Sequence, residues 1–243
     1  RGAAEYLESL GFVPDARCLL LSSPDFILKH DGLDVERTMP ANVCARDGQS
    51  GNERRSRQNW TNRQIRELVS TLTRSGCKVY CSVFTTFMEN KFAHEWLSDH
   101  PEVRLSWASH WRGQELNVLA QLADGSFFED YFIPQTVKVC RDYGFAGWHG
   151  PDGWGPWSSG SLCDTDFSDS MIGQFTSGRN WSLPECFAPI PRLVTMHEIR
   201  AAEKAGKQVP DWGLSQLRAR RDWITRNHFS EWLDFVANRW IQF

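Results

Sequence analysis

The sequence predicts a parallel α/β fold of the (β/α)8-barrel (TIM) type, built only in part, with about four strand–helix units and long loop insertions. Three observations predict this fold. Short apolar segments typical of buried parallel strands alternate with helical patterns along the chain. The first such segment runs into Ser22-Ser23-Pro24-Asp25, not into the glycine-rich turn of an open nucleotide-binding sheet. Only four strands can be recognised, whereas a whole barrel has eight.

Four segments have the character of strands, and we expect them to be parallel and adjacent in chain order. The first is a continuous apolar run, and the second is rich in β-branched and aromatic residues. The third is less apolar and leads into the turn Ala123-Asp124-Gly125. The predicted strands lie near 18–22, 78–84, 116–121 and 144–149.

Three helical patterns accompany these strands. Thr61 and Gln64 form a capping box, which opens an apolar stripe at i, i+3, i+4 and i+7 that continues to Leu72. A second helix is expected over 130–143, where Gly144 stops it, and a third begins near Phe229. The remaining length is assigned to two long loop insertions in a single domain over 1–243, at 31–60 and 178–215.

The composition argues against several classes of protein. Hydrophobic residues make up 41% of the 243 residues and the net charge is −3, which argues against a disordered chain and against nucleic-acid binding by bulk charge. Without an apolar run of about 18 residues we expect no membrane span. The N-terminus lacks the apolar core of a signal peptide. Because half a barrel has open edges, we expect a second chain or a missing segment to complete it.

Twelve tryptophans against four tyrosines is the unusual feature of the composition. The surplus suggests aromatic surfaces in a groove, although large barrels also bury several indoles. Seven cysteines without a CxxC pair are expected to be mostly buried free thiols rather than a disulfide framework.

The richest segment follows the fourth strand, where a barrel carries its functional residues. Within ten residues it delivers a carboxylate, a histidine and three indoles to the rim: Asp152, His149, Trp148, Trp154 and Trp157. Pyranose rings lie with their C–H faces on aromatic rings while their hydroxyls bond to charged groups. A sugar site is therefore predicted here; the alternative is a Gly/Pro-rich loop whose tryptophans only cover the barrel end.

The same region carries a resemblance to a known family. The segments are DYGFAGWHGPDGWGP (142–156), LTRSGCKVYCSVFTTF (72–87) and EWLSDHPEVR (95–104). They resemble (β/α)8 glycoside hydrolases of the α-amylase and α-glucosidase type, over about residues 17–175. In that family a helix ending in YGFDG leads into strand four, and a carboxylate just past the strand is the nucleophile. The resemblance places Asp152 nearest that role. This chain has Ala146 where the family pattern has Asp, and its spacing to Asp152 is one residue longer than in the amylase pattern.

Glycoside hydrolysis needs a second carboxyl group about 5–10 Å from the first. Further ligands for sugar hydroxyls are expected after the first strand at Asp25, His30 and Asp31. No metal is predicted, because the Asp164-x-Asp166 sequence lacks the glycine of a calcium loop, and no cofactor is predicted, because the sequence contains no P-loop. The candidates for the second carboxyl group are Asp25, Glu89, Asp164, Asp166 and Asp169.

Two functions remain open from the sequence. The leading hypothesis is a glycoside hydrolase that acts on an oligo- or polysaccharide, with Asp152 as the catalytic carboxylate. The second is a catalytically silent carbohydrate-binding or assembly module with a degenerate barrel site, which Ala146 and the half-barrel favour. The compartment is left open, with an extracellular or cell-surface location favoured, and the sugar, the linkage and the stereochemical outcome are not determined.

Overall fold

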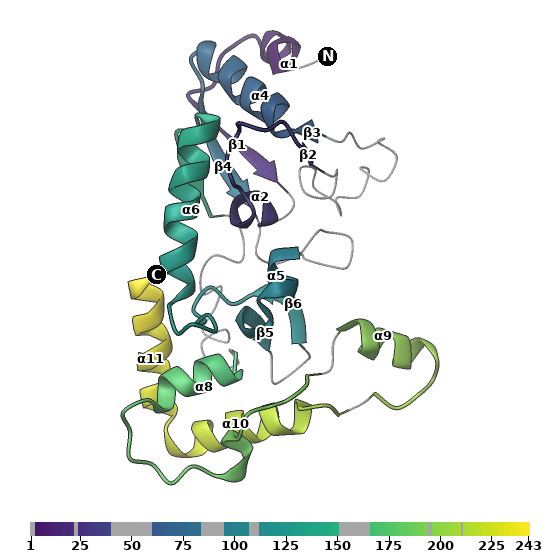
Figure 1. Cartoon of the computed structure of the whole chain (residues 1–243), viewed down its shortest axis with the longest axis vertical. Helices are drawn as coiled ribbons and strands as arrows, with labels where there is room; N and C mark the ends of the chain where they lie inside the picture. Colours follow the sequence, from purple (N-terminus) through teal and green to yellow (C-terminus); the bar gives the residue numbers. More distant parts are fainter. Residues whose placement is uncertain are drawn as a thin grey trace. The chain divides into compact units, whose positions relative to one another are not determined.

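A computed structural model describes residues 3–21, 24–39, 60–83, 95–106, 112–150, 166–193, 196–209 and 211–243. The chain is mixed α/β and divides into two compact units, each built from two stretches of sequence. We call the first the sheet unit (Arg1–Trp96 and Asp130–Trp154) and the second the helical unit (Leu97–Glu129 and Gly155–Phe243). Figure 1 shows the elements of both.

A three-stranded parallel sheet forms the centre of the sheet unit. Its strands are β1 (Ala16–Leu21), β4 (Lys78–Val83) and β7 (Gly147–His149), which pair in that order. A parallel α/β fold is thus confirmed, with strands at three of the four predicted places. The other elements of this unit are α1 (Ala3–Leu10), α2 (Asp25–Leu28), β2 (Thr38–Met39), β3 (Trp60–Thr61) and α4 (Asn62–Arg74), with most of α6 (Phe128–Tyr143).

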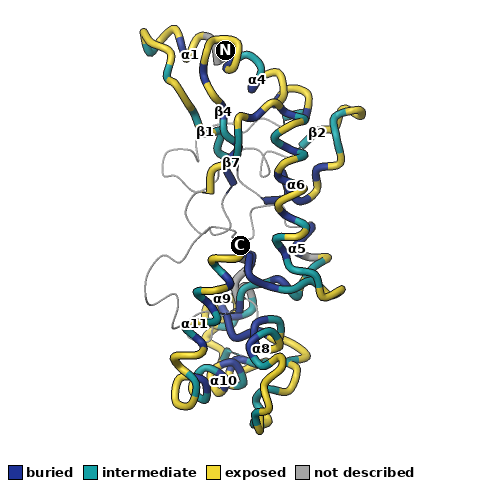
Figure 2. The backbone as a smooth tube through the Cα atoms, turned by 90° about the vertical axis from the view of Figure 1, so that its left-hand side faces the viewer, coloured by how far each residue is buried: buried dark blue, intermediate teal, exposed yellow. Residues whose placement is uncertain are grey.

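Alternating side chains give the sheet two different faces. Paired residues of neighbouring strands point to the same side, so Cys81 and its partner Trp148 share one face. That face meets α6, because Trp148 packs edge to face on Phe132 with ring centroids 5.7 Å apart. The opposite face carries Tyr80 and Ser82. Figure 2 shows buried and exposed residues alternating along the helices, as expected for elements that cover a core on one side.

The predicted capping box begins α4. The Thr61 hydroxyl accepts a hydrogen bond from the Gln64 backbone N–H at 3.1 Å, and the Gln64 carboxamide oxygen accepts one from the Thr61 N–H at 2.9 Å. Residues of the apolar stripe are buried, with Ile65 2% and Val69 0% exposed. The prediction of this helix from sequence is confirmed.

The prediction of a third parallel strand over 116–121 is wrong. β4 pairs directly with β7, and Leu116 instead ends β6 (Arg112–Leu116), which pairs antiparallel with β5 (Arg104–Ser106). The Asn117 side chain accepts a hydrogen bond from the Leu119 N–H, which competes with continued strand pairing. Beyond it, the chain folds back so that Gln121 bridges Phe127 across the predicted turn.

The helical unit is built around a cluster of aromatic side chains. Trp232, 1% exposed, stacks on Phe167 and meets Phe175 edge to face, both at centroid distances of 5.0 Å. The predicted C-terminal helix is confirmed as α11 (Phe229–Gln242). The other elements are α5 (Glu95–Asp99), which begins in the sheet unit, η1 (Pro101–Val103), α8 (Asp169–Thr176), η2 (Glu185–Phe187), α9 (Met196–Lys204) and α10 (Leu214–Asn227).

Candidate functional site

Most of the predicted site residues follow β1 or β7 closely in the sequence, so the candidate site is the carboxyl edge of the parallel sheet. Leu21 of β1 pairs with Val83 of β4, and Ser82 of β4 pairs with His149 of β7. The three strands therefore end within one residue of one another, and the chain leaves all of them at the same edge. In parallel sheets this edge is where ligands bind, because the topology brings together residues that are distant in sequence.

His149 is held at this edge by Ser82. The Ser82 hydroxyl donates to the main-chain carbonyl of His149 at 3.1 Å, and its oxygen lies 3.2 Å from His149 Nδ1. Ser82 is fully buried, whereas His149 is exposed. In the tautomer that carries its proton on Nδ1, this nitrogen donates to the Ser82 oxygen while the Ser82 hydroxyl donates to the carbonyl. His149 Nε2 is then a hydrogen-bond acceptor.

Tyr80 shares the face of the sheet with His149. Gly147 pairs with Tyr80, and a Cβ at Gly147 would lie 3.1 Å from the nearest carbon of the Tyr80 ring. The absence of a side chain at this position lets the ring lie across β7. An aromatic ring and an imidazole thus lie on one face of the sheet, with the imidazole at the carboxyl edge.

Trp148, predicted to contact substrate, points to the other face. Its ring packs against Phe132 of α6, on the side of the sheet that the helix covers. The strand alternation that turns His149 toward one face turns Trp148 toward the other. The structure therefore separates these two predicted neighbours.

His30, also predicted to contact substrate, forms a buried pair with Asp142 at 2.8 Å. Its backbone carbonyl accepts a hydrogen bond from the Gln135 side chain, and its ring lies 5.2 Å from that of Tyr143. Burial lowers the pKa of His30 more than Asp142 raises it, and the hydrogen bond to His30 lowers the pKa of Asp142. These contacts fasten the segment after α2 to α6.

The two acidic residues predicted after β1 have different surroundings. Asp25 begins α2 and is only 6% exposed. Asp31 is exposed and forms an ion pair with Arg37. Asp25 is therefore the described carboxyl group that follows β1 most closely and is also sheltered from solvent.

Asp152, Trp154 and Trp157 lie outside the described residues, and so do Glu89 and Asp164. For Asp152 and its two tryptophans the sequence gives only their separation from β7 along the chain. β7 ends at His149, so the chain reaches Asp152 three residues after it leaves the carboxyl edge.

Asp166 and Asp169, two candidates for the second carboxyl group, belong to the helical unit and are engaged there. Asp166 is buried and accepts hydrogen bonds from the Ser106 N–H at 3.0 Å and the Ser168 N–H at 2.8 Å. Asp169 forms an ion pair with Arg220 at 2.6 Å. Both carboxylates therefore stabilise the unit in which they lie.

The described residues also bear on metals and membranes. Nowhere among them do three or more His, Cys, Asp or Glu side chains gather as a metal ion would require. Among the described helices, none combines the length and the apolar character needed to span a bilayer.

Ser82 and Tyr80 were not identified by sequence analysis. Their signal is the alternation of residue type along β4, where Tyr80 and Ser82 alternate with the apolar residues Val79, Cys81 and Val83. Such a period of two marks a strand whose second face is not fully apolar. A continuous apolar run at β1 and the short β7 conceal that signal in the other strands.

The chain was compared with family models, curated proteins and solved structures. None of the three comparisons finds a match.

Proposed function

We propose that this chain is a carbohydrate-active hydrolase of (β/α)8-barrel type, with Asp152 as its nucleophile. The observation that carries the proposal is the parallel order β1–β4–β7, in which the strands pair as they follow one another in the chain and end at one edge. A barrel is built in this way, and its catalytic residues follow its strands. In the sequence Asp152 follows three residues after His149, the last residue of β7 at this edge.

The two faces of the sheet support the same proposal. One face meets α6 through Trp148, as the outer face of a barrel meets its helices. The other carries exposed Cys18 and half-buried Leu20 and Tyr80. In a barrel this second face would line the interior, where further strands fill the space.

The substitution of Ala146 for the Asp of the family pattern is compatible with activity. Ala146 lies just before β7, and its N–H donates to the carbonyl of Val79 near the beginning of β4. It therefore belongs to the amino edge of the sheet. Residue 149 lies about 10 Å further along the strand, at the rise per residue of parallel strands. A carboxylate at 146 would be remote from the rim where the proposed chemistry occurs.

The proposed reaction is a displacement at the anomeric carbon. The Asp152 carboxylate attacks that carbon and forms an ester, while the bond to the leaving oxygen breaks and a second carboxylic acid gives that oxygen its proton. Water then attacks the ester, loses a proton to the second carboxylate and releases Asp152. Trp154 and Trp157 would stack on the sugar, and His149 Nε2 would accept a hydrogen bond from a sugar hydroxyl.

The test uses the whole chain and a panel of 4-nitrophenyl glycosides, together with the matching 2-deoxy-2-fluoroglycosyl fluorides. We expect one of the fluorides to add the mass of one fluorosugar to the peptide that contains Asp152. Asp152→Asn should abolish this labelling and lower hydrolysis by several orders of magnitude, because the nucleophile is lost. Asp25→Asn tests the sheltered carboxyl group as proton donor.

Asp15→Asn is the matched control. Asp15 is exposed and precedes β1 at the amino edge, so its substitution should leave turnover unchanged. Hydrolysis that survives Asp152→Asn would show that the assignment of the nucleophile is wrong. Saccharide binding at the carboxyl edge of the sheet without turnover in the unaltered chain would support the alternative, a silent binding module.

A further inference from the structure

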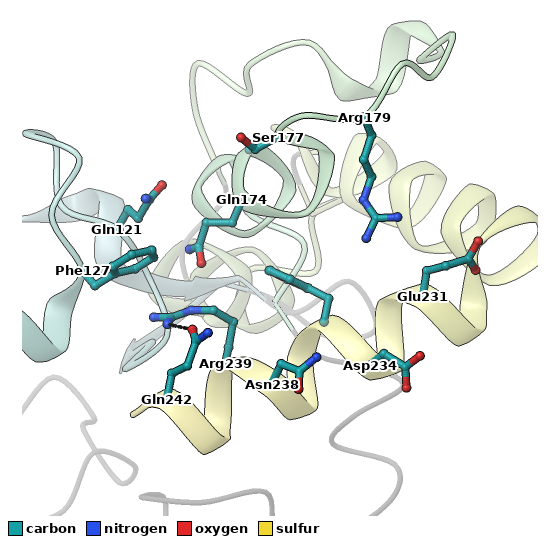
Figure 3. Close-up of a pocket in the computed structure, with 12 residues that line it drawn as sticks. Gln121, Phe127, Gln174, Ser177, Arg179, Glu231, Asp234, Asn238, Arg239 and Gln242 are labelled. Atoms are coloured by element: carbon teal, nitrogen blue, oxygen red, sulfur yellow. Dashed lines mark hydrogen bonds between the residues drawn. The ribbon is translucent and has the colours of Figure 1, made fainter.

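A cavity of about 540 Å³ lies within the helical unit, between α8, α11 and the turn around Phe127 (Figure 3). All of its lining residues belong to this unit, so it is separate from the sheet edge that carries His149. Its volume is within the range of about 300–1,000 Å³ typical of small-molecule sites. Nothing in the function proposed above uses it.

The floor of the cavity contains a buried arginine. Arg239, 5% exposed, binds both oxygens of Glu129 at 2.8 and 3.1 Å, and its guanidinium lies 4.1 Å from the Phe127 ring centroid. It also donates to Gln242 at 2.8 Å. The positive charge is therefore balanced by Glu129, and the arginine is fixed in place by its neighbours.

Two polar atoms of this floor have no hydrogen-bond partner among the described residues. They are Arg239 Nε and Gln174 Oε1, a donor and an acceptor, and both are buried. Arg239 and Gln174 face each other across the floor in Figure 3. Buried polar atoms are paired in nearly all proteins, so this donor and acceptor favour a polar group over an apolar one at the cavity.

The rim presents polar groups with free bonding capacity. On α11, Asp234 and Asn238 are exposed, and neither side chain makes a hydrogen bond or ion pair with any described residue. Glu231, one helical turn earlier on the same face, is held by His228 at 3.2 Å. Across the cavity, Arg179 lies over the Trp181 ring at 4.6 Å, which leaves its N–H groups free to donate.

The charges of the rim restrict the ligand. Glu231 and Asp234 would repel an anion, and Arg179 would repel a cation. The free groups are an acceptor-only carboxylate, a donor-only guanidinium and an amide that does both. A hydroxyl is the ligand group that meets all three, because it donates one hydrogen bond and accepts others. The half-buried ring of Phe235 adds an apolar wall for C–H groups.

We propose that this cavity is a saccharide-binding site of the helical unit, distinct from the carboxyl edge of the sheet. Asp234, Asn238 and Arg179 bond to the hydroxyls, and Phe235 packs against a sugar ring. The proposal rests on the cavity and not on Asp152, so the two can fail separately.

The test is saturation-transfer NMR and calorimetry with the whole chain, using cellobiose, maltose, xylobiose and lactose as probes. We expect at least one disaccharide to bind, and its affinity to fall by about tenfold or more in the double variant Asp234→Ala, Asn238→Ala, since two hydrogen-bonding groups are lost. Both positions are exposed on α11, so the fold should be retained, which circular dichroism checks.

Two control variants establish whether a loss of affinity belongs to this cavity. Glu203→Gln removes an exposed charge from α9, outside the cavity, and should leave the affinity unchanged. Asp152→Asn should also leave binding at the cavity unchanged. The proposal is overturned if no disaccharide binds, if binding is equal in the double variant, or if the zwitterion glutamine binds and displaces the sugar.

Discussion

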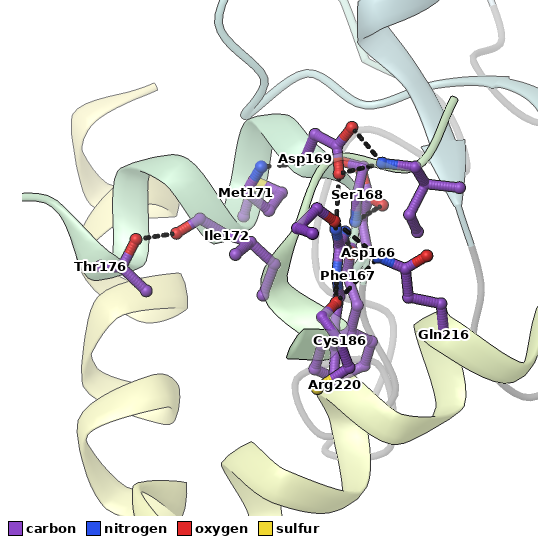
Figure 4. A network of polar contacts seen from close by, with 12 residues as sticks. Asp166, Phe167, Ser168, Asp169, Met171, Ile172, Thr176, Cys186, Gln216 and Arg220 are labelled. Atoms are coloured by element: carbon purple, nitrogen blue, oxygen red, sulfur yellow. Dashed lines mark hydrogen bonds and ion pairs between the residues drawn. The ribbon is translucent and has the colours of Figure 1, made fainter. Parts of the chain in front are cut away.

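At the scale of single residues, two buried charged groups organise the helical unit. Arg220 is fully buried and donates to the carbonyls of Phe167, Cys186 and Ala188 as well as to Asp169 (Figure 4). The planar guanidinium has enough donors in a fixed geometry to satisfy all four acceptors at once. A single side chain of α10 thus fastens the start of α8 and the η2 segment.

Asp166 is the second of these groups, and its hydrogen bonds and its burial shift its pKa in opposite directions. Four donors favour its carboxylate: the N–H groups of Ser106 and Ser168, the Asn117 amide and the Ser168 hydroxyl. Burial disfavours the charged form more strongly and raises the pKa of Asp166 from 3.8 to about 6.

A pH-dependent contribution to stability follows for Asp166. Between about pH 4 and pH 6 the unfolded chain has lost this proton while the folded chain still binds it, so stability falls as pH rises. Asp166→Asn removes the titration. We expect the free energy of unfolding of the wild type, relative to this variant, to fall by on the order of 3 kcal/mol from pH 4 to pH 7.

Urea unfolding at several pH values measures this difference. Asp124→Asn provides a control of opposite sign, because hydrogen bonds from Ser126 lower the pKa of Asp124 and its contribution is lost as pH falls. A difference for Asp166→Asn that does not vary with pH would show that the four hydrogen bonds cancel the effect of burial.

At the scale of elements, local signals fix where helices begin. The Thr61 hydroxyl accepts from Gln64 and donates to Glu36 at 2.7 Å, so the cap of α4 also attaches the segment that precedes β2. Such a cap satisfies backbone N–H groups that the first helical turn leaves without partners.

Removing the cap hydroxyl should therefore destabilise the sheet unit. We expect Thr61→Ala to lower the free energy of unfolding by about 1 kcal/mol. Glu67→Ala is the matched control, since Glu67 is exposed in the middle of the same helix and its change should stay within about 0.5 kcal/mol. Equal effects of the two substitutions in urea titrations would contradict a role for the cap.

At the scale of the whole molecule, the division into two units has an energetic consequence. The parallel sheet and the aromatic cluster around Trp232 belong to different units, and each unit has its own buried core. Units with separate cores open separately when their internal contacts are stronger than those between them.

Hydrogen exchange on Arg220→Met tests this division. We expect the variant to lose roughly 3 kcal/mol of stability in the helical unit, because several acceptors lose a buried partner. Peptides covering 166–176 and 214–227 should then exchange faster, while β4 keeps its protection. Arg221→Met, which alters a surface ion pair on the same helix, should change little. Equal loss of protection in β4 would show that the chain unfolds as one cooperative unit.

The sequence by itself determined the elements whose signals are local. The capping box of α4, the apolar stripe of α11 and the apolar segments of β1 and β4 are visible in short windows, because capping and periodic burial act over a few residues. The parallel α/β class follows from their alternation.

The tertiary structure decided what depends on distant partners. Leu116 pairs antiparallel with Arg104 of β5, a partner that the local apolar pattern does not encode, and does not join the parallel sheet. Trp148 and His149 are neighbours in sequence, yet only the covering of one face by α6 decides which of them meets solvent. Ser82 lies 67 residues from His149 and holds it by hydrogen bonds through a pairing register that no local pattern encodes. Local preference sets the elements, and long-range pairing sets the site, because the free energy of a contact depends on residues that the sequence places far apart.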